Sequence, residues 1–386
     1  MSERVRVLVV DDSALMRKLI PAILARDSSI EVVGTAMDGA FALKKIEELR
    51  PDVVTLDLEM PRMDGMEALR LIMRNAPVPV ILFSTHSKEG AYSTFKALAL
   101  GAIDFVAKPK DAAAGHLDAI ADDLIRKIKV AKRAGGFKVS APVIGDKPPL
   151  KKKDGSASLP PNRIIAIGIS TGGPNALQFV LSQIPADFPA SIVVVQHMPE
   201  GFTEMFARRL DECCALDVQE ARSGDLLQAG RVLICPGNRH VMVRRMPRGD
   251  MTVLSDGPPV NGHRPSADVL FHSVAQEFGP TAVGIIMTGM GEDGAEGIGA
   301  IKAAGGVTLA QSEESCVVGG MPRAAIQKGY VAKVIPLDGL SAHLIAQYGG
   351  ERVRGEKSDR HENSDKIEKQ DKNEKSERTP VSSHRT

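Results

Sequence analysis

The 386-residue chain contains no tryptophan and only four cysteines, and aromatic residues make up 4% of it. Its cysteines are Cys213, Cys214, Cys235 and Cys316. Their spacing matches neither a CxxC zinc site nor the disulfide framework of a small secreted domain. We therefore expect buried free thiols in a reducing compartment, and no structural metal cluster.

An excess of charge of one sign is also missing, because the formal net charge is +1 at pH 7. A balanced chain gives no electrostatic reason to bind nucleic acid or an anionic membrane surface. The N-terminus has no apolar signal region, and no uninterrupted apolar run is long enough to cross a bilayer. These absences predict a cytoplasmic protein that neither binds nucleic acid nor inserts into a membrane.

The length exceeds the size at which a single hydrophobic core usually divides, and a hydrophobic fraction of 43% is enough for two cores. In the first third, β-branched runs alternate with helical patterns. The runs are VRVLVV, IEVVGTA, DVVTLDL, VPVILFS and DFVAKP. Five strands with intervening helices predict a doubly wound parallel sheet over residues 3–130, with its last helix near residues 116–132.

Composition changes mark the other boundaries. Residues 131–162 are rich in Gly, Pro, Lys and Ser, which predicts an exposed linker. Residues 163–349 return to an α/β pattern, with a turn-rich section that predicts an antiparallel hairpin inserted in the sheet. Residues 350–386 are mostly charged and polar, so they cannot bury a core and should form a disordered tail.

Five polar residues lie at the carboxyl ends of the predicted strands of the first domain, and ligands of an open parallel sheet collect at this edge. Asp11, Asp12 and Asp57 form a carboxylate group that a hard cation such as Mg²⁺ would neutralise. Asp57 could then accept a phosphoryl group, with Lys108 and the Ser84 hydroxyl contacting its oxygens. Any one aspartate could instead simply cap a helix, but five positions in strand-end register favour a phosphate-accepting switch.

A second set of reactive residues lies in the C-terminal part of the chain. Ser170 lies in GISTGG, a GxSxG turn between a predicted strand and a helix, although such a turn can also bind phosphate or only pack tightly. His197 follows the next apolar strand and is the candidate base. Asp293, in TGMGEDG, can orient the imidazole, with Glu292 as a competitor for that role. The three residues predict a serine hydrolase.

Residues 3–130 strongly resemble the receiver domain of response regulators, which has a flavodoxin-like fold. The resemblance implies that Asp57 takes phosphate from a histidine kinase. It also implies that Asp12 and Asp57 hold Mg²⁺ with help from Asp11 and the Glu59 carbonyl. Ser84 and Phe105 would relay the switch.

Residues 163–348 closely resemble the catalytic domain of the chemotaxis protein-glutamate methylesterase family, CheB. The matching segments are GISTGGP, VVQHMPEGFTEMFARRL, DGPPVNGHRPSADVLFHSVA, MTGMGEDGAEG and ESCVVGGMPRAAI. The resemblance implies hydrolysis of glutamyl γ-methyl esters on the cytoplasmic helices of chemoreceptors, with glutamine deamidation as a second activity and no cofactor for hydrolysis.

In that family's reaction Ser170 would attack, His197 would act as base and then acid, and Asp293 would orient His197. Backbone N–H groups near Met290 and Thr171 are candidates for the oxyanion hole. The unphosphorylated receiver would shield the Ser170 edge, and phosphorylation would loosen that contact. His240, His263 and Arg264 could line the substrate groove or be structural.

Three alternatives fit part of the sequence. A receiver-controlled esterase or amidase could serve another signalling array, and only a substrate assay separates it from receptor demethylation. A non-enzymatic response regulator would need a helix-turn-helix with a basic recognition helix, or would lack a triad member, and neither is seen. GISTGG as a nucleotide-binding loop fits neither GxGxxG nor Walker spacing.

Overall fold

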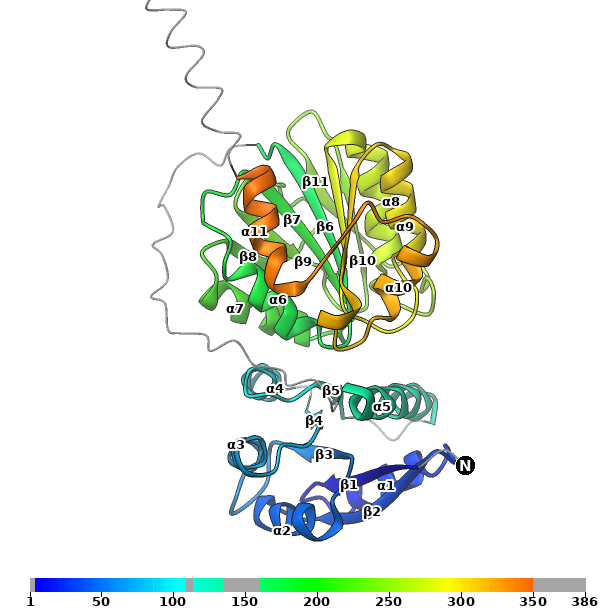
Figure 1. The fold of residues 1–386 in the computed structure, drawn as a ribbon. Helices are drawn as coiled ribbons and strands as arrows, with labels where there is room; N and C mark the ends of the chain where they lie inside the picture. Colours follow the sequence, from blue (N-terminus) through cyan, green and yellow to red (C-terminus); the bar gives the residue numbers. More distant parts are fainter. Residues whose placement is uncertain (1–3, 86, 109–113, 135–159, 350–386) are drawn as a thin grey trace, which may run out of the picture.

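The computed structural model describes residues 4–85, 87–108, 114–134 and 160–349, which form two α/β units (Figure 1). The predicted tail, residues 350–386, and most of the predicted linker lie outside the described residues. None of the helices in the described part of the chain is both long and apolar enough to cross a bilayer.

The N-terminal unit is a five-stranded parallel sheet with the order β2-β1-β3-β4-β5. Its strands are β1 (Val5–Val10), β2 (Ile30–Ala36), β3 (Val53–Asp57), β4 (Val80–Ser84) and β5 (Asp104–Ala107). Its helices are α1 (Met16–Leu24), α2 (Gly39–Leu49), α3 (Gly65–Asn75), α4 (Lys88–Ala99) and α5 (Ala114–Ala134). The predicted doubly wound parallel sheet is confirmed.

Alternate side chains of the central strands enter two separate cores because neighbouring residues of a strand face opposite sides. One core packs β1 and β4 against α1 and α5, and the other packs the opposite face against α2, α3 and α4. The aspartates Asp38 and Asp64 cap α2 and α3 by accepting backbone N–H groups at 2.9 Å and 2.8 Å. These caps explain why both helices begin where the sequence pattern places them.

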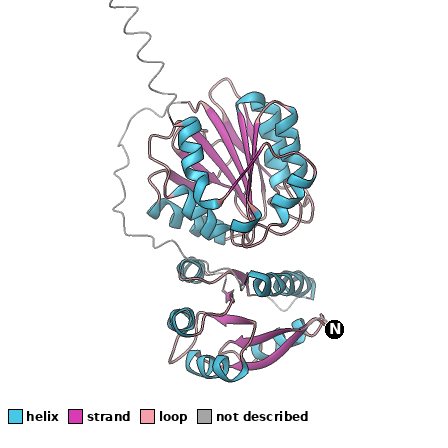
Figure 2. Cartoon of the chain, viewed as in Figure 1, coloured by secondary structure: helices cyan, strands magenta, loops and turns pink. Residues whose placement is uncertain are grey.

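The C-terminal unit is a seven-stranded parallel sheet with the order β14-β13-β12-β6-β7-β9-β8. Its strands are β6 (Arg163–Ile169), β7 (Ala190–Gln196), β8 (Asp217–Glu220), β9 (Arg231–Ile234), β12 (Ala282–Ile286), β13 (Val307–Gln311) and β14 (Lys333–Ile335). Its α-helices are α6 (Gly173–Leu181), α7 (Phe202–Cys213), α8 (Ala267–Phe278), α9 (Ala295–Ala303), α10 (Gly320–Gln327) and α11 (Leu337–Tyr348). The helices cover both faces of the sheet (Figure 2).

The predicted antiparallel hairpin is present, but its place differs from the prediction. β10 (His240–Arg244) and β11 (Met251–Ser255) pair only with each other among the named strands of the described chain and are not inserted in the large sheet. The buried side chains Val241 and Val243 pack against α8, so the hairpin lies over a helical layer. The turn-rich section also contains RVLI, which is β9 of the main sheet and not part of the hairpin.

Candidate functional site

Three neighbouring parallel strands of the C-terminal sheet, β12, β6 and β7, end at one edge. Ser170 directly follows β6, His197 directly follows β7, and the loop after β12 carries Asp293. The structure thus brings the predicted nucleophile, base and carboxylate to the carboxyl edge of the same sheet, where ligands of such sheets bind.

The loop of Ser170 is fixed by backbone bonds on both sides. The Ser170 N–H donates to the Thr288 carbonyl at 2.9 Å, and its own carbonyl accepts from the Gly173 N–H at 2.8 Å. The Gln196 amide donates to the same carbonyl at 3.0 Å. Gly172 has a φ of 76°, a conformation that favours glycine, which permits the sharp strand-to-helix turn. Ser170 is half-buried at the start of this turn.

His197 and Asp293 form a buried pair, with His197 Nε2 2.8 Å from Asp293 Oδ2. The other ring nitrogen, Nδ1, is buried and has no hydrogen-bond partner among the described residues. An imidazole held by a carboxylate at one nitrogen can accept a serine proton at the other. No hydrogen bond joins Ser170 to His197 in the described chain, and such bonds commonly tighten only when substrate binds.

The Asp293 carboxylate is held at the N-terminus of α8. Ser266 Oγ donates to Oδ1 and the Ala267 N–H donates to Oδ2, both at 2.6 Å. Burial alone would raise the pKa of Asp293, but the hydrogen bond and charge of His197, together with the bonds from Ser266 and Ala267, lower that pKa to about 2. The carboxylate is therefore ionised at neutral pH and can stabilise a positive imidazolium.

Gly289 lets the loop after β12 pass directly against the nucleophile. A Cβ atom added at Gly289 would lie 2.8 Å from Ser170 Cβ and 2.2 Å from Met321 Sδ. Both are closer than Cβ atoms tolerate, so only glycine fits without movement. This close approach ties the position of the Asp293 loop to that of Ser170.

The two predicted oxyanion positions, Thr171 and Met290, lie in the loops on either side of this contact. Within the described chain, neither backbone N–H donates a hydrogen bond. Free donors beside a nucleophile are what a developing oxyanion requires. The Thr171 carbonyl accepts from Thr288 Oγ1 at 2.9 Å, which fixes the orientation of the peptide that follows Thr171.

Sequence reasoning missed the residues that support the triad. Ser266 precedes α8 at its N-cap, yet its hydroxyl binds Asp293 and does not cap the helix. Asn261 donates from its amide to Asp268 Oδ2 at 2.7 Å and to Asp293 Oδ1 at 3.3 Å. The serine before a helical pattern and the Asn261-Gly262 dipeptide were visible signals of a cap and a turn, but neither signal indicates a contact with Asp293.

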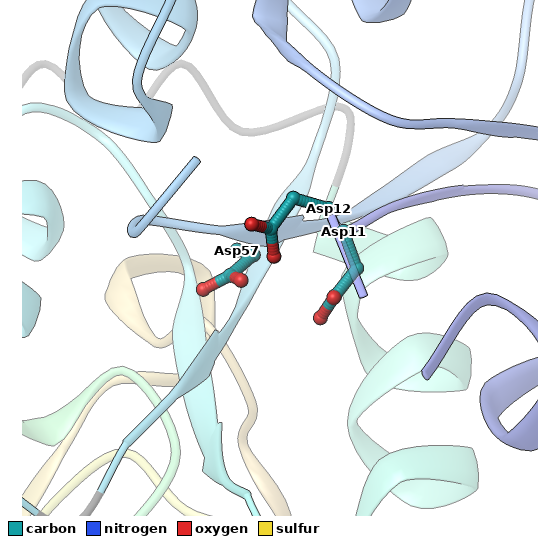
Figure 3. A group of neighbouring side chains, drawn as sticks. All are labelled: Asp11, Asp12 and Asp57. Atoms are coloured by element: carbon teal, nitrogen blue, oxygen red, sulfur yellow. The ribbon is translucent and has the colours of Figure 1, made fainter. Parts of the chain in front are cut away.

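The N-terminal unit has its own polar cluster, formed by Asp11, Asp12 and Asp57 (Figure 3). One oxygen of each carboxylate lies within 4.8 Å of the others. Lys108 Nζ is 2.6 Å from Asp57 Oδ2 and 3.1 Å from Asp11 Oδ2. Burial raises the pKa of Asp57 to about 6, with Lys108 opposing and Asp11 reinforcing the shift. The oxygen-rich, partly exposed set fits Mg²⁺, which prefers carboxylates together with water.

Of the other predicted residues, Glu59 contacts this cluster and Ser84 contacts α4. The Glu59 N–H donates to Asp57 Oδ1 at 3.2 Å. The Ser84 hydroxyl is turned toward α4, where it accepts from Thr94 Oγ1 at 2.6 Å and donates to the Gly90 carbonyl at 3.3 Å. A contact of Ser84 with a phosphoryl group on Asp57 would therefore require these bonds to rearrange.

The two units touch through α4 and β5 of the first and α6 and α7 of the second. The ring of Phe105 stacks on Phe202 with centroids 4.6 Å apart, and Phe95 stacks on Phe206 at 5.2 Å. Lys88 Nζ lies 3.3 Å from a Glu204 carboxylate oxygen. The Asn175 amide also donates to the Leu98 carbonyl at 2.8 Å. The predicted switch residue Phe105 is thus buried in the contact between the units.

The remaining candidates have structural contacts. His240 is buried, with Nε2 3.0 Å from the Pro258 carbonyl. The Arg264 guanidinium binds Asn238 and two backbone carbonyls, and His263 lies over His197. All four cysteines are free, and three of them are buried. Burial raises the pKa of Cys316 to about 12, which argues against a reactive thiol.

Comparison with known proteins gives the same two-part division. The family model "CheB methylesterase" matches residues 165–344, and "Response regulator receiver domain" matches residues 7–119. Protein-glutamate methylesterase/protein-glutamine glutaminase 2 of Koribacter versatilis is 62% identical over 90% of this chain and 98% of that protein. Two further relatives are named protein-glutamate methylesterase/protein-glutamine glutaminase. The protein of Symbiobacterium thermophilum is 46% identical over 88% of this chain and 97% of its own length. The protein of Pyrococcus horikoshii is 44% identical over 88% of this chain and 92% of its own length.

Proposed function

This chain belongs to the CheB methylesterase family, and we propose that Ser170, His197 and Asp293 are the residues that carry out its hydrolysis of glutamyl γ-methyl esters. The enzyme is a protein-glutamate methylesterase and protein-glutamine glutaminase with an attached receiver domain. We assign the receiver to residues 3–130, the linker to 131–162 and the catalytic domain to 163–349.

The geometry supports one sequence of steps. Ser170 Oγ attacks the γ-carbonyl carbon while His197 Nδ1 takes the hydroxyl proton. The imidazolium, held by Asp293, then gives this proton to the leaving methoxide, so that methanol departs and an acyl-enzyme remains. Water, deprotonated by His197, attacks the acyl carbon and releases glutamate and free Ser170. A glutamine side chain follows the same course with ammonia as the leaving group.

The oxyanion of each tetrahedral intermediate would lie against the backbone N–H groups of Thr171 and Met290. Donors of this kind stabilise charge that develops only in the transition state, and losing one typically slows a hydrolase by about 10²- to 10³-fold. Hydrolysis needs no cofactor in this scheme. The observation that carries the assignment is the 2.8 Å pair between His197 Nε2 and Asp293, together with a buried His197 Nδ1 that has no hydrogen-bond partner among the described residues.

Control by the receiver follows from its contact with the catalytic domain. We propose that Asp57 receives a phosphoryl group from a chemotaxis histidine kinase, and that the new contacts of Ser84 and Lys108 displace α4 and Phe105. The stacking on α7 is then weakened, and the Ser170 edge becomes accessible to substrate. Asp11, Asp12, Asp57 and the Glu59 carbonyl would hold Mg²⁺, which neutralises the crowded oxygens when it is bound.

The substrates we propose are methylated glutamates on the cytoplasmic helices of chemoreceptors, which would place the reaction in the cytoplasm. Support comes from the family membership and from the paired receiver and esterase domains. A receiver-controlled esterase of another signalling array would share the same site and differ only in its substrate.

The experiment is methanol release from methylated chemoreceptor membranes by wild type, Ser170→Ala and Asp57→Asn, each with and without a small phosphodonor and Mg²⁺. We expect wild type to be active and donor-stimulated, Ser170→Ala to be inactive, and Asp57→Asn to ignore the donor. Full activity of Ser170→Ala would overturn the assigned nucleophile. An inactive wild type would instead indicate another substrate.

A further inference from the structure

A second histidine covers the base of the triad. The imidazole ring of His263 stacks on that of His197, with ring centroids 4.0 Å apart and an interplanar angle of 5°. Parallel rings at this distance are in van der Waals contact over their faces. The position of the His197 ring plane is therefore limited on one side by His263 and at its Nε2 edge by Asp293.

A tight turn presents His263 in this position. The backbone groups of Val260 and His263 bond each other in both directions, at 2.9 and 3.0 Å. Between them, Asn261 and Gly262 have φ values of 52° and 76°. Positive φ at both central residues is the mark of a two-residue type I′ turn, for which Asn-Gly is the favoured sequence. His263 thus lies at the end of a rigid turn.

The turn is also tied to the triad carboxylate. The Asn261 amide bridges Asp268 Oδ2 and Asp293 Oδ1, so the turn that carries His263 and the group that holds His197 share one network. The next residue, Arg264, fastens the other side of the loop through its bonds to Asn238 and to the carbonyls of Asp256 and Gly257. These bonds leave the His263 ring little freedom to move relative to the His197 ring.

His263 is uncharged at neutral pH, which suits a ring that packs against His197, because His197 becomes positively charged for part of the reaction. Burial, the neighbouring His197 and the Arg126 guanidinium lower the pKa of His263 to about 4, while Asp293 and Asp123 oppose this shift. His263 is therefore neutral at neutral pH. A neutral aromatic face attracts a cation, whereas a second imidazolium would repel it.

We propose that His263 is a positioning residue for the hydrolysis: its ring fixes the plane of the His197 imidazole in the orientation in which Nδ1 can take the Ser170 proton, and supports the imidazolium that forms in the transition state. This inference rests on the proposed role of His197 as the base. His263 itself exchanges no proton with substrate in this scheme, so an aromatic ring of similar shape should replace it.

The test compares wild type with His263→Phe, His263→Ala and His263→Gln in full-length protein, and with His343→Ala on α11 as a remote histidine control. Initial rates of methanol release give kcat and KM, and the rate of Ser170 labelling by a serine-directed fluorophosphonate gives a second readout. Thermal melting identifies variants that do not fold, and His263→Gln replaces His263→Ala as the ringless variant if the latter is unfolded.

We expect the ringless variants to lose about 10- to 100-fold in kcat and in labelling rate, since an angstrom of misplacement can cost 10²-fold. KM should change little, and His263→Phe should recover to within about threefold of wild type. Unchanged kcat in the ringless variants would overturn the inference, as would equal loss in His263→Phe or an effect on KM alone. If wild type neither hydrolyses the ester nor labels at Ser170, the proposed function fails instead.

Discussion

The Phe105 ring of the receiver stacks on Phe202 of the catalytic domain, with centroids 4.6 Å apart and planes 28° from parallel. Phe105 lies in β5, which is separated from β3, the strand of Asp57, by β4 alone. Phe202 is the first residue of α7, the helix that follows the loop of His197. A movement of Phe105 therefore acts on an element only five residues beyond the proposed base. This contact gives phosphorylation of Asp57 a short physical route to the hydrolase.

The contact between the domains can be weakened without damaging either core. Lys88 and Glu204 form an exposed ion pair across it at 3.3 Å. Lys88→Glu places like charges there, and a change of up to about 1 kcal/mol corresponds to about a fivefold shift in population. We expect methanol release without phosphodonor to rise about two- to fivefold at low salt.

The double charge reversal Lys88→Glu with Glu204→Lys should return this activity to the wild-type level, and added salt should reduce the effect of either single change. Lys44→Glu, the same charge change on α2, is the control and should leave the activity unchanged. A double variant as active as Lys88→Glu alone would contradict the role given to this pair.

Asp293 and Glu292 are adjacent carboxylates, but we expect only the substitution of Asp293 to reduce kcat strongly. Asp293→Asn should reduce kcat by on the order of 10⁴, because an amide cannot hold the same imidazole tautomer or stabilise its charged form. Glu292 is exposed and lies 3.7 Å from Lys328, so Glu292→Gln should remain within about twofold of wild type. Steady-state methanol release decides between them, and a larger loss in Glu292→Gln would reassign the orienting carboxylate.

Strand-end placement made much of this site predictable, because parallel strands deliver the residues that follow them to one edge. Ser170 and His197 follow their strands directly, Asp57 is the last residue of β3, and the helices after Asp38 and Asp64 begin at their caps. The contacts of Ser266, Asn261 and His263 with the triad were not predictable. They depend on how the loop before α8 folds over the sheet edge, which no local periodicity encodes.

The placement of strands in the second sheet shows the same limit. The short strands β8 and β14 have four and three residues and lie at the edges, where little apolar patterning is required. Neither was predicted. The hairpin β10–β11 was predicted, but the choice between pairing with the sheet and packing on α8 is made by tertiary contacts.

Gly289 should tolerate no side chain. A Cβ there would lie 2.8 Å from Ser170 Cβ, so Gly289→Ala must displace either the nucleophile or the loop that leads to Asp293. We expect about a 100-fold loss of kcat with the protein still folded by circular dichroism. Gly339→Ala on α11 is the matched control, since its added Cβ meets only ordinary contacts at 3.4 Å and beyond. Equal activities of the two variants would contradict the close approach.

Removal of divalent cations should affect the phosphorylation site of the receiver but not the hydrolase site. A chelator should abolish stimulation by phosphodonor, because Asp11, Asp12 and Asp57 hold their mutually repelling oxygens within 4.8 Å. Hydrolysis without donor should be unaffected, since the Ser170 site uses no cation in the proposed scheme. Asp12→Asn is expected to weaken the dependence of stimulation on Mg²⁺ concentration. Loss of donor-independent methanol release on chelation would contradict this division.

The lowered pKa of His263 predicts a specific loss of stability in acid. Folding holds the pKa near 4, compared with 6.5 for an ordinary histidine, so the unfolded chain binds more protons between these values. The free energy of unfolding must therefore fall as pH drops from about 6.5 toward about 4. The charged and titratable groups that act on this ring are His197, which stacks on it, and Asp293, Arg126 and Asp123, whose charges shift its pKa.

The His263→Phe variant has no side chain that can take up this proton. Its free energy of unfolding should therefore fall less in acid than that of wild type. Urea unfolding of wild type and His263→Phe at pH 7.5 and pH 4.5 gives the comparison. We expect wild type to lose about 1–2 kcal/mol more than the variant between the two values, after allowance for solvent screening of a partly exposed ring. A difference between the two proteins that does not change with pH would mean that His263 titrates normally, and that its face is not held neutral against His197.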